Sequence, residues 1–364
     1  MTWVAPATAR EAPKRTYIVN ELKRRIVEGE VHLGQQLPPR VDLVRDFDAS
    51  SKTLQEALDV LMEEGFVISQ GNKGTFVAER PPHLSRYGFV FAPDPGGMWL
   101  AFTNAIQRAV GGVEQERSCR FVFYQDITRH TDTLGYQQLL QDIEARRLAG
   151  LIFRGNVRLL DLDKTPFVTT PGLPRVAVSG LPAVPGVTYV VADGAMLCDK
   201  VLDRFASRGR RRIAFLSDFA LSTERMHYLA NGVEKRGMTM RPTWVHVLPR
   251  DAVRRVVGLL MSLPPGERPD GLLVGDENMM NEVSAGLLES GVDVKRDIDT
   301  VAYSYMPSSL KSLVPVTRIG EDVRELLRAF VDVIDRTART HTVQKDVVVK
   351  PLFEEELTVP VEAM

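Results

Sequence analysis

Apolar and polar positions repeat with two different periods along the chain, and the change of period divides it into two parts. Between residues 16 and 77, apolar positions recur at helical spacing. From residue 87 to residue 364, short apolar runs of strand length alternate with helical stretches, which predicts parallel sheets with helices on both faces. Residues 78–86 contain two adjacent prolines and predict an extended, semi-rigid linker. Residues 1–15 lack periodicity and predict a flexible arm.

The first part is predicted to hold three helices. The first ends at Gly29, and its buried stripe consists of Ile18, Leu22 and Ile26. The second begins near Pro38 or Pro39. Its inward-facing residues are predicted to be Val41, Val44 and Phe47. The third begins near Ser51 and ends at Gly65, and its apolar stripe is Leu54, Ala57, Leu58, Leu61 and Met62.

A short β-hairpin is predicted to follow these helices. Its strands are FVIS and TFVA, and its tip is QGNKG. Three helices and a small hairpin make the winged helix-turn-helix plan, in which the N-terminal residues of the third helix face base edges in the major groove. The residues at that position are Ser51, Lys52, Thr53 and Gln55.

The second part is too long for one hydrophobic core, since it spans about 280 residues. Two α/β lobes that face each other across a cleft are therefore expected. The predicted strands are YGFVFA, RFVFY, GLIF, RVAVS, TYVVA, RIAFLS, WVHVL, GLLVG, TVAYS and VTRIG. The predicted fold class is α/β, with a winged helix-turn-helix followed by a two-lobed domain of parallel sheets flanked by helices.

Composition narrows the setting of the protein. Apolar residues make up 44% of the chain and charged residues 26%, and the net charge is −1. Because no bulk charge attracts a polyanion, any nucleic-acid surface depends on local placement of cations. The two cysteines, Cys119 and Cys198, have no metal-like spacing, and no stretch is long and apolar enough for a signal peptide or a membrane span. A cytoplasmic location without membrane contact is expected.

Enzyme motifs are missing from the chain. It contains no G-x-G-x-x-G after a strand, no phosphate-binding loop, no G-x-S-x-G and no H-E-x-x-H. We therefore expect no enzyme, no catalytic residues, no cofactor and no metal.

The first part resembles the GntR family of bacterial transcription regulators. The resemblance rests on I-x-x-G ending at Gly29, G-x-x-L-P ending at Pro38, A-L-x-x-L-x-x-E-G ending at Gly65, and G-T-F-V ending at Val77. The family often has an arginine where this chain has Val41, and S-R-x-T-V-R where it has residues 50–55. Since both of those recognition-helix arginines are replaced, by Ser51 and Gln55, and glutamine pairs with adenine, we expect an operator with fewer guanine contacts.

The resemblance also implies which residues contact DNA. Phosphate contacts are expected from Arg40, Arg45 and Lys52, and a groove or backbone contact from Lys73 and Gly74 at the hairpin tip. The run Lys23-Arg24-Arg25 offers further cations, although a solvated helix face explains it better. The alternative for the whole domain is a degenerate helix that no longer binds DNA.

The second part resembles the LacI/GalR sensor, whose fold is that of periplasmic sugar-binding proteins. The stretches that carry this likeness are residues 89–102, 146–153, 190–217, 222–237 and 268–294. The combination with a GntR reader is similar to the arabinose-responsive repressors. The loop RGRRR at 208–212 is interpreted as solvated.

Ligand contacts follow from this second resemblance. Arg225 stands at the family's ligand arginine, Asp276 at the second acid of an Asn-Asp pair, Trp99 at a stacking aromatic, and Asp94 in the same first loop. Three positions depart from the family and thin the polar clamp: Gly275, Ser179 with Gly180, and Ser304. Core packing is the alternative for Trp99, and an ion pair with Asp218 is the alternative for Arg225.

The resemblances imply a ligand-controlled transcription regulator, most simply a repressor of carbohydrate-related genes. A sugar or sugar derivative would close the two lobes and change the spacing of two DNA readers in a homodimer. Two-fold symmetry implies a pseudo-palindromic operator on double-stranded DNA. The alternative is a soluble α/β small-molecule-binding protein or enzyme with a vestigial DNA-binding domain.

Overall fold

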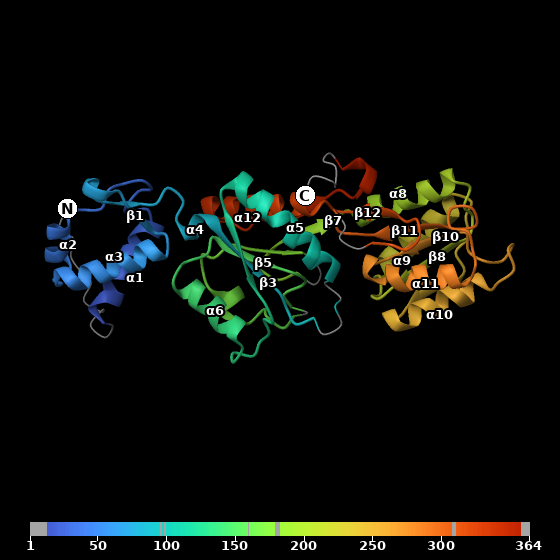
Figure 1. Ribbon diagram of the computed structural model, residues 1–364, viewed down its shortest axis with the longest axis horizontal. Helices are drawn as coiled ribbons and strands as arrows, with labels where there is room; N and C mark the ends of the chain where they lie inside the picture. The colour runs from blue at the N-terminus through green and yellow to red at the C-terminus, as the bar shows by residue number, and fades with distance from the viewer. Residues whose placement is uncertain are drawn as a thin grey trace. The chain divides into compact units, whose positions relative to one another are not determined.

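The structure is a computed structural model that describes residues 13–94, 97, 100–158, 160–178, 183–307 and 311–357. The chain divides into two compact units. The first holds residues up to 93 with 114–189 and 331–345, and the second holds 94–113, 190–330 and the residues from 346 on. Figure 1 shows the elements of each. Within the described residues, the helices are all too short or too polar to cross a membrane.

The N-terminal domain has the three helices and the hairpin that the sequence predicts. Its elements are α1 (Lys14–Val27), α2 (Arg40–Asp46), α3 (Ser51–Glu63), β1 (Val67–Ser69) and β2 (Thr75–Val77). The two strands pair antiparallel, with Ile68 opposite Phe76. The apolar stripes of α1 and α3 meet in one core that includes Ile18, Leu22, Leu54, Leu58 and Leu61. Burial of these stripes holds the domain together.

One prediction within α2 is wrong. Val41 was expected to face inward, but its side chain is 72% exposed. The buried residue of this short helix is Leu43, and Phe47 is buried directly after it. Since Pro39 caps the helix and Arg40 begins it, the helical turn directs residues 43 and 47 to the core and turns Val41 towards solvent.

The predicted extended linker is wrong in part, because it contains a helical turn. Residues Pro82–Ser85 form α4, with Pro82 in its first turn. That position suits proline, which has no N–H to leave unpaired there. The His83 ring stacks on Phe66 at a centroid distance of 5.8 Å. Burial and the nearby charge of Arg146 lower the pKa of His83 to about 4.

The first of two six-stranded sheets has the order β13-β7-β6-β5-β3-β4. Its strands are β3 (Arg86–Val90), β4 (Arg120–Tyr124), β5 (Gly150–Phe153), β6 (Arg175–Val178), β7 (Thr188–Ala192) and β13 (Val347–Val349). The helices of this region are α5 (Leu100–Arg117), α6 (Leu134–Glu144), α7 (Pro166–Thr169) and α12 (Val323–Thr340). Figure 1 shows α6 and the C-terminal half of α12 on opposite sides of the sheet. Gly150 allows this packing, since a Cβ there would lie 2.6 Å from the Cγ2 of Ile334.

The second sheet has the order β14-β12-β11-β10-β8-β9, and all its strands but β14 are parallel. Its strands are β8 (Ile213–Ser217), β9 (Val245–Val247), β10 (Gly271–Val274), β11 (Asp299–Tyr303), β12 (Thr317–Gly320) and β14 (Leu352–Phe353). The helices that cover it are α8 (Gly194–Ser207), α9 (Thr223–Lys235), α10 (Arg250–Met261) and α11 (Met280–Glu289).

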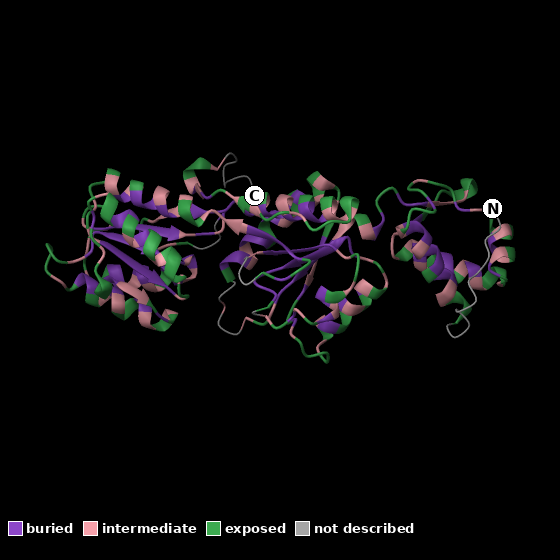
Figure 2. Cartoon of the chain, turned by 180° about the vertical axis from the view of Figure 1, so that it is seen from behind, coloured by how far each residue is buried: buried purple, intermediate pink, exposed green. Residues whose placement is uncertain are grey.

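Successive side chains of a strand point to opposite faces of the sheet, and each face is covered by a different pair of helices. Leu272 and Val274 pack in one cluster with α10 and α11, whereas Leu273, between them, packs with α8 and α9. Both faces of the central strands are therefore buried, as the purple strands in Figure 2 show. The predicted fold class is confirmed. The short β13, β14 and α7 were not predicted, because two to four residues carry too little periodicity.

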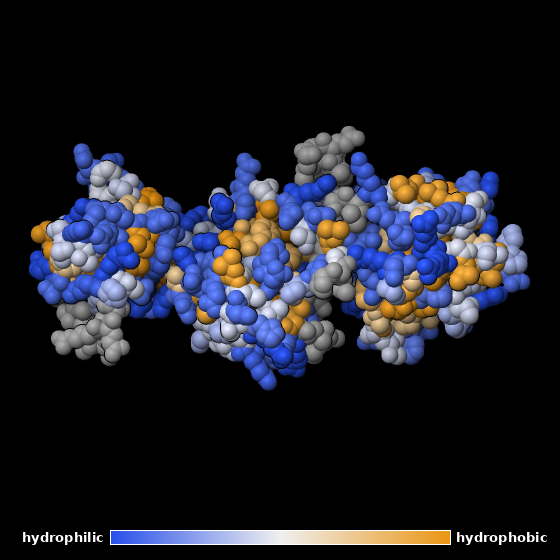
Figure 3. Space-filling model, turned by 60° about the horizontal axis from the view of Figure 1, so that its bottom comes forward, coloured by the Kyte–Doolittle hydropathy of each residue, from blue (hydrophilic) through white to orange (hydrophobic). Residues whose placement is uncertain are grey.

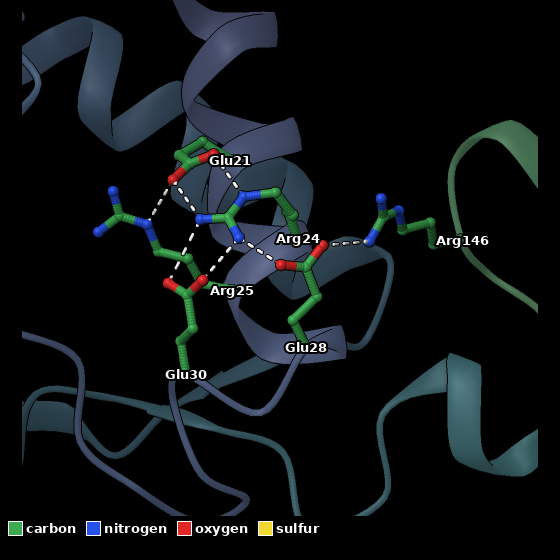
Figure 4. A network of polar contacts seen from close by, with 6 residues as sticks. All are labelled: Glu21, Arg24, Arg25, Glu28, Glu30 and Arg146. Atoms are coloured by element: carbon green, nitrogen blue, oxygen red, sulfur yellow. Dashed lines mark hydrogen bonds and ion pairs between the residues drawn. The ribbon is translucent and has the colours of Figure 1, made fainter. Parts of the chain in front are cut away.

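Both basic runs noted in the sequence are structural. In α1, Lys23 and Arg25 are buried, and Lys23 pairs with Glu64. Figure 4 shows Arg24 and Arg25 on Glu21, with Arg24 also on Glu28 and Glu30. In the loop at 208–212, the predicted solvated run, Arg208 and Arg210 pair with Asp299 and Arg212 pairs with Asp270. The interpretation of these runs as solvated is therefore wrong for the buried Lys23 and Arg25 and for the paired Arg210 and Arg212, whereas Arg208 and Arg211 are exposed.

Candidate functional site

The turn between α2 and α3 presents the N-terminus of α3. Asp48 turns the chain there with φ +46, in the left-handed region that Asp tolerates better than most residues. Ser50 then caps α3, because its Oγ accepts from the Thr53 N–H at 3.0 Å. Thr53 Oγ1 lies 2.8 Å from the same oxygen. Thr53, predicted to face DNA, therefore contributes to the cap.

The other predicted DNA contacts of these helices, together with the exposed Val41, make up a set of residues that we call the reading face: Arg40, Val41, Arg45, Ser51, Lys52 and Gln55. Ser51 and Lys52 are exposed, and Lys52 pairs with no carboxylate among the described residues. Arg45 is exposed too, but it pairs with Asp42 at 2.9 Å and with Asp46 at 3.4 Å. The reading face thus carries at least one cation, Lys52, that makes no ion pair among the described residues.

Gln55 sits between two charged neighbours on this face. Its Oε1 accepts a hydrogen bond from Nη2 of Arg40, and its Nε2 donates to Oδ1 of Asp59 at 2.5 Å. Gln55 is half-buried, whereas Arg40 and Asp59 are exposed. The chain of contacts runs from α2 to α3 and then along α3 by one turn.

The hairpin tip is held against the strand-like residue before α2. Gln36 Nε2 donates to the carbonyl of Lys73 at 2.6 Å, and Gln36 pairs with Phe76 as an isolated bridge. Gly74 has φ +106, and a Cβ there would lie 2.7 Å from Gln36 Nε2. This backbone conformation favours glycine. The Lys73 side chain is exposed at the tip, where the sequence places a DNA contact.

A second candidate region lies in the second unit, where three parallel strands end. Asp218 follows β8, Asp276 follows β10 and Ser304 follows β11. The register aligns Leu216, Val274 and Ala302, so the three strand ends lie at one edge of the sheet. Ligands of parallel sheets bind at such carboxyl ends.

Asp276 is the best-defined residue of this edge. Its Oδ1 accepts from both the N–H and Nδ2 of Asn278 at 2.7 Å. Asn278 Oδ1 in turn accepts from the N–H of Ala101 at 3.1 Å. Burial, reinforced by the negative charge of Asp218, raises the pKa of Asp276 to about 6 against the hydrogen bonds from Asn278 and the charge of Arg250.

Arg250 lies at the same edge and was not predicted. It donates to the carbonyl of Gly97 at 2.8 Å and pairs with Asp218 at 3.7 Å. The Asp218 side chain is only 9% exposed, and its Oδ1 has no hydrogen-bond partner among the described residues. Asp218 directly follows β8, and Arg250 begins α10, the helix after β9.

The predicted ligand residues do not all lie together in the described chain. Arg225 is in the first turn of α9, exposed and beside Gly194, and no described carboxylate pairs with it. The alternative ion pair with Asp218 is therefore wrong, since Asp218 pairs with Arg250. Trp99 and Ser179 lie outside the described residues.

The remaining predicted positions have clear surroundings. Asp94 is half-buried. Ser304 is fully buried, and its hydroxyl has no hydrogen-bond partner among the described residues. Gly275 is required sterically, because a Cβ there would lie 2.8 Å from Ser217 Oγ and 3.3 Å from the Phe215 ring. The space that an asparagine would need in this chain is thus filled from β8. In the described residues, no group of three or more His, Cys, Asp or Glu side chains is placed to hold a metal.

Two families match parts of the chain. Residues 14–77 match the bacterial regulatory proteins of the gntR family, and residues 202–354 match the periplasmic binding protein-like domain. The HTH-type transcriptional regulator GmuR of Bacillus subtilis (strain 168) is 33% identical over 66 residues, which are 18% of this chain and 28% of that protein. The chain therefore matches only about a quarter of this relative's length.

Solved structures resemble the two-lobed part. A LacI-family regulatory protein from Chloroflexus aggregans has a TM-score of 0.59 at 14% identity, covering 74% of this chain and 96% of its own. The transcriptional regulator CelR in complex with cellobiose has a TM-score of 0.56 at 18% identity, covering 84% and 90%. Such low identities show a shared fold. The chain thus joins a gntR-type DNA-binding domain to a two-lobed domain with the fold of LacI-family regulators.

Proposed function

We propose that this protein is a transcription regulator that binds an operator through the reading face and releases it when a small molecule binds the second region. The observation that carries the first half is the set of cations on α2 and α3 that no carboxylate neutralises fully. Arg40 and Lys52 make no ion pair among the described residues, although α1 pairs every cation of its basic run. Exposed cations around the N-terminus of a recognition helix suit phosphates and base edges.

The second half rests on the polar edge of the second sheet. Asp218 and Asp276 offer carboxylate oxygens, and Arg250 offers a guanidinium, all at strand ends. Such groups grip pairs of hydroxyls, so a sugar or sugar derivative is the proposed effector. CelR, of similar fold, was solved with cellobiose. Arg225, Asp94, Trp99, Ser179 and Ser304 remain the residues proposed from the resemblance to contribute.

A homodimer that binds a pseudo-palindromic operator and represses carbohydrate-related genes in the cytoplasm completes the proposal. Selection from random double-stranded DNA with the full-length protein tests it directly. We expect one enriched motif with two inverted half-sites. Failure to enrich any motif, at low ionic strength and without added sugar, contradicts DNA reading and leaves the vestigial-domain alternative.

The effector half is tested by thermal unfolding in the presence of a panel of mono- and disaccharides. At least one sugar should raise the melting temperature and weaken operator binding. Arg225→Ala should abolish both effects and keep the affinity for DNA without sugar. Lys235→Ala, at the exposed last turn of the same helix, is the matched control. An unchanged sugar response in Arg225→Ala contradicts the ligand role proposed for Arg225.

A further inference from the structure

The amide of Gln55 is occupied at both ends in the free protein. Its oxygen accepts from Arg40, and its nitrogen donates to Asp59 at 2.5 Å. A glutamine reads adenine by using the same two atoms, donating through the nitrogen and accepting through the oxygen. Reading by Gln55 therefore requires both existing contacts to break. The residue type alone favours adenine, but its surroundings do not.

Arg40, in contrast, keeps most of its donors available. A guanidinium has five N–H donors in a fixed fork, and the contact with Gln55 uses one side of it. Arg40 is exposed and pairs with no carboxylate among the described residues, whereas Arg45 pairs with two. A guanidinium held at one edge presents its remaining N–H groups in a defined direction. That arrangement suits the O6 and N7 acceptors of guanine.

The positions of the two helices support the same assignment. Arg40 begins α2, and Gln55 lies in the second turn of α3, so their contact joins the two helices of the helix-turn-helix across the reading face. Val41, the next residue, is 72% exposed, and its apolar side chain offers no hydrogen-bond acceptor to the guanidinium of Arg40. Asp59 thus accepts from Gln55, and Gln55 accepts from Arg40, so that the chain of hydrogen bonds begins at the guanidinium of Arg40.

We propose that Arg40 reads a guanine in each operator half-site, and that Gln55, held by Asp59, positions Arg40 rather than reading adenine. This inference rests on the proposed function, and it revises the expectation that loss of the recognition-helix arginines removes guanine contacts. In this assignment the base-reading arginine lies on α2, and the glutamine of α3 supports it.

The test combines motif selection with single-atom changes in the operator. Wild-type protein should enrich a guanine at one fixed position of each half-site. Replacing that guanine by 7-deazaguanine removes the N7 acceptor and should weaken binding about tenfold, as expected for a bidentate arginine contact. Arg40→Ala should bind both duplexes equally and enrich no base at that position. Val41→Ala, at the neighbouring exposed residue, should keep the wild-type preference.

Gln55→Glu separates positioning from reading. Glutamate still accepts from Arg40 but cannot donate to adenine N7, so we expect the guanine preference to survive with reduced affinity. Gln55→Ala should keep the position of the motif and weaken its guanine preference. If Gln55→Glu instead loses an adenine while Arg40→Ala keeps the full motif, the inference is overturned. If wild-type protein enriches nothing, the proposed function itself fails, which is a different result.

Discussion

Two sets of basic side chains in the N-terminal domain differ in how they are paired. Lys23, Arg24 and Arg25 on α1 are held by carboxylates of the same domain, and two of them are buried. Arg40 and Lys52 on the reading face are exposed and pair with none of the described carboxylates. The difference shows that a charge run marks a DNA surface only when the fold leaves its charges unpaired.

The energetic reasons for the two arrangements differ. A buried lysine needs its partner, because an uncompensated charge in the interior is costly. An exposed lysine is solvated and costs almost nothing until DNA arrives. The face of the molecule in Figure 3 is mostly hydrophilic, with hydrophobic side chains in separate patches. Many exposed charges are therefore available, and position decides which of them act.

Breaking the buried pair should give the largest effect. Lys23 and Glu64 have side chains 4% and 16% exposed, so Lys23→Ala leaves an acid in the interior with only Arg147 beside it. We expect the free energy of unfolding to fall by about 3 kcal/mol. Urea unfolding followed by circular dichroism measures this.

The matched control for that variant keeps the volume and removes both charges. Lys23→Met combined with Glu64→Gln should lie within about 1.5 kcal/mol of wild type. If Lys23→Ala and this double variant have the same free energy of unfolding, an unpaired Glu64 costs no stability. The proposed energetic difference between paired buried charges and exposed charges is then wrong.

Asp276 is intermediate between these two cases, since it is a half-buried acid that makes no ion pair among the described residues. Its pKa in the folded protein is about 6, above the ordinary 3.8. The folded state therefore binds the proton more tightly, and stability falls as pH rises from about 4 to about 6. Above pH 6 the penalty is complete, at most about 3 kcal/mol for a shift of two units.

Asp276→Asn should remove this penalty. At pH 7 the variant should be roughly 1–3 kcal/mol more stable than wild type, and the difference should shrink at pH 5. Thermal or urea unfolding at the two pH values checks the prediction. Asp251→Asn, at an exposed acid in the first turn of α10, is the control and should change neither value. If Asp276→Asn is less stable than wild type at pH 7, desolvation of the Asp276 carboxylate does not dominate its effect on stability.

How much of this was predictable from sequence varies from residue to residue. The stripe from Leu54 to Leu61 indicated α3 correctly, because a helix that buries one face shows its period. Val41 was placed wrongly, since periodicity does not settle where a seven-residue helix begins. The sequence alone favours a solvated or phosphate-binding role for Lys23. Its partner Glu64 lies at the end of α3, and only the tertiary fold brings the two residues together.

The second region shows the same limit for ligand residues. Asp276 was predicted from a resemblance; it follows the end of β10, and its ligand role stays a prediction. Arg250 was not predicted, since its contacts with Asp218 and Gly97 cross about 30 and 150 positions of the chain, beyond what local pattern or motif spacing reports. Side-chain pairing, rather than secondary structure, is what the sequence leaves open.

Removing exposed cations should affect DNA binding without affecting the fold. Arg45→Ala combined with Lys52→Ala should reduce the slope of log affinity against log salt by about 2, one for each phosphate contact. Stability should stay within about 0.5 kcal/mol of wild type. Fluorescence anisotropy over a salt series gives the slope, with Arg296→Ala, exposed in the second unit, as control. An unchanged salt slope would mean that DNA phosphates do not contact Arg45 or Lys52.

The smallest effect on DNA binding is expected at Ser50, which caps α3 next to the reading face. Ser50→Ala removes the oxygen that accepts from the Thr53 N–H at 3.0 Å, and should cost about 1 kcal/mol of stability. The salt slope should not change, because no cation is lost. Ser50→Asn keeps an acceptor and should restore most of the stability. If Ser50→Ala lowers the salt slope of DNA binding as much as the loss of Lys52 does, the helix cap itself contributes to phosphate binding. The unpaired cations of α2 and α3 would then not account for the salt dependence alone.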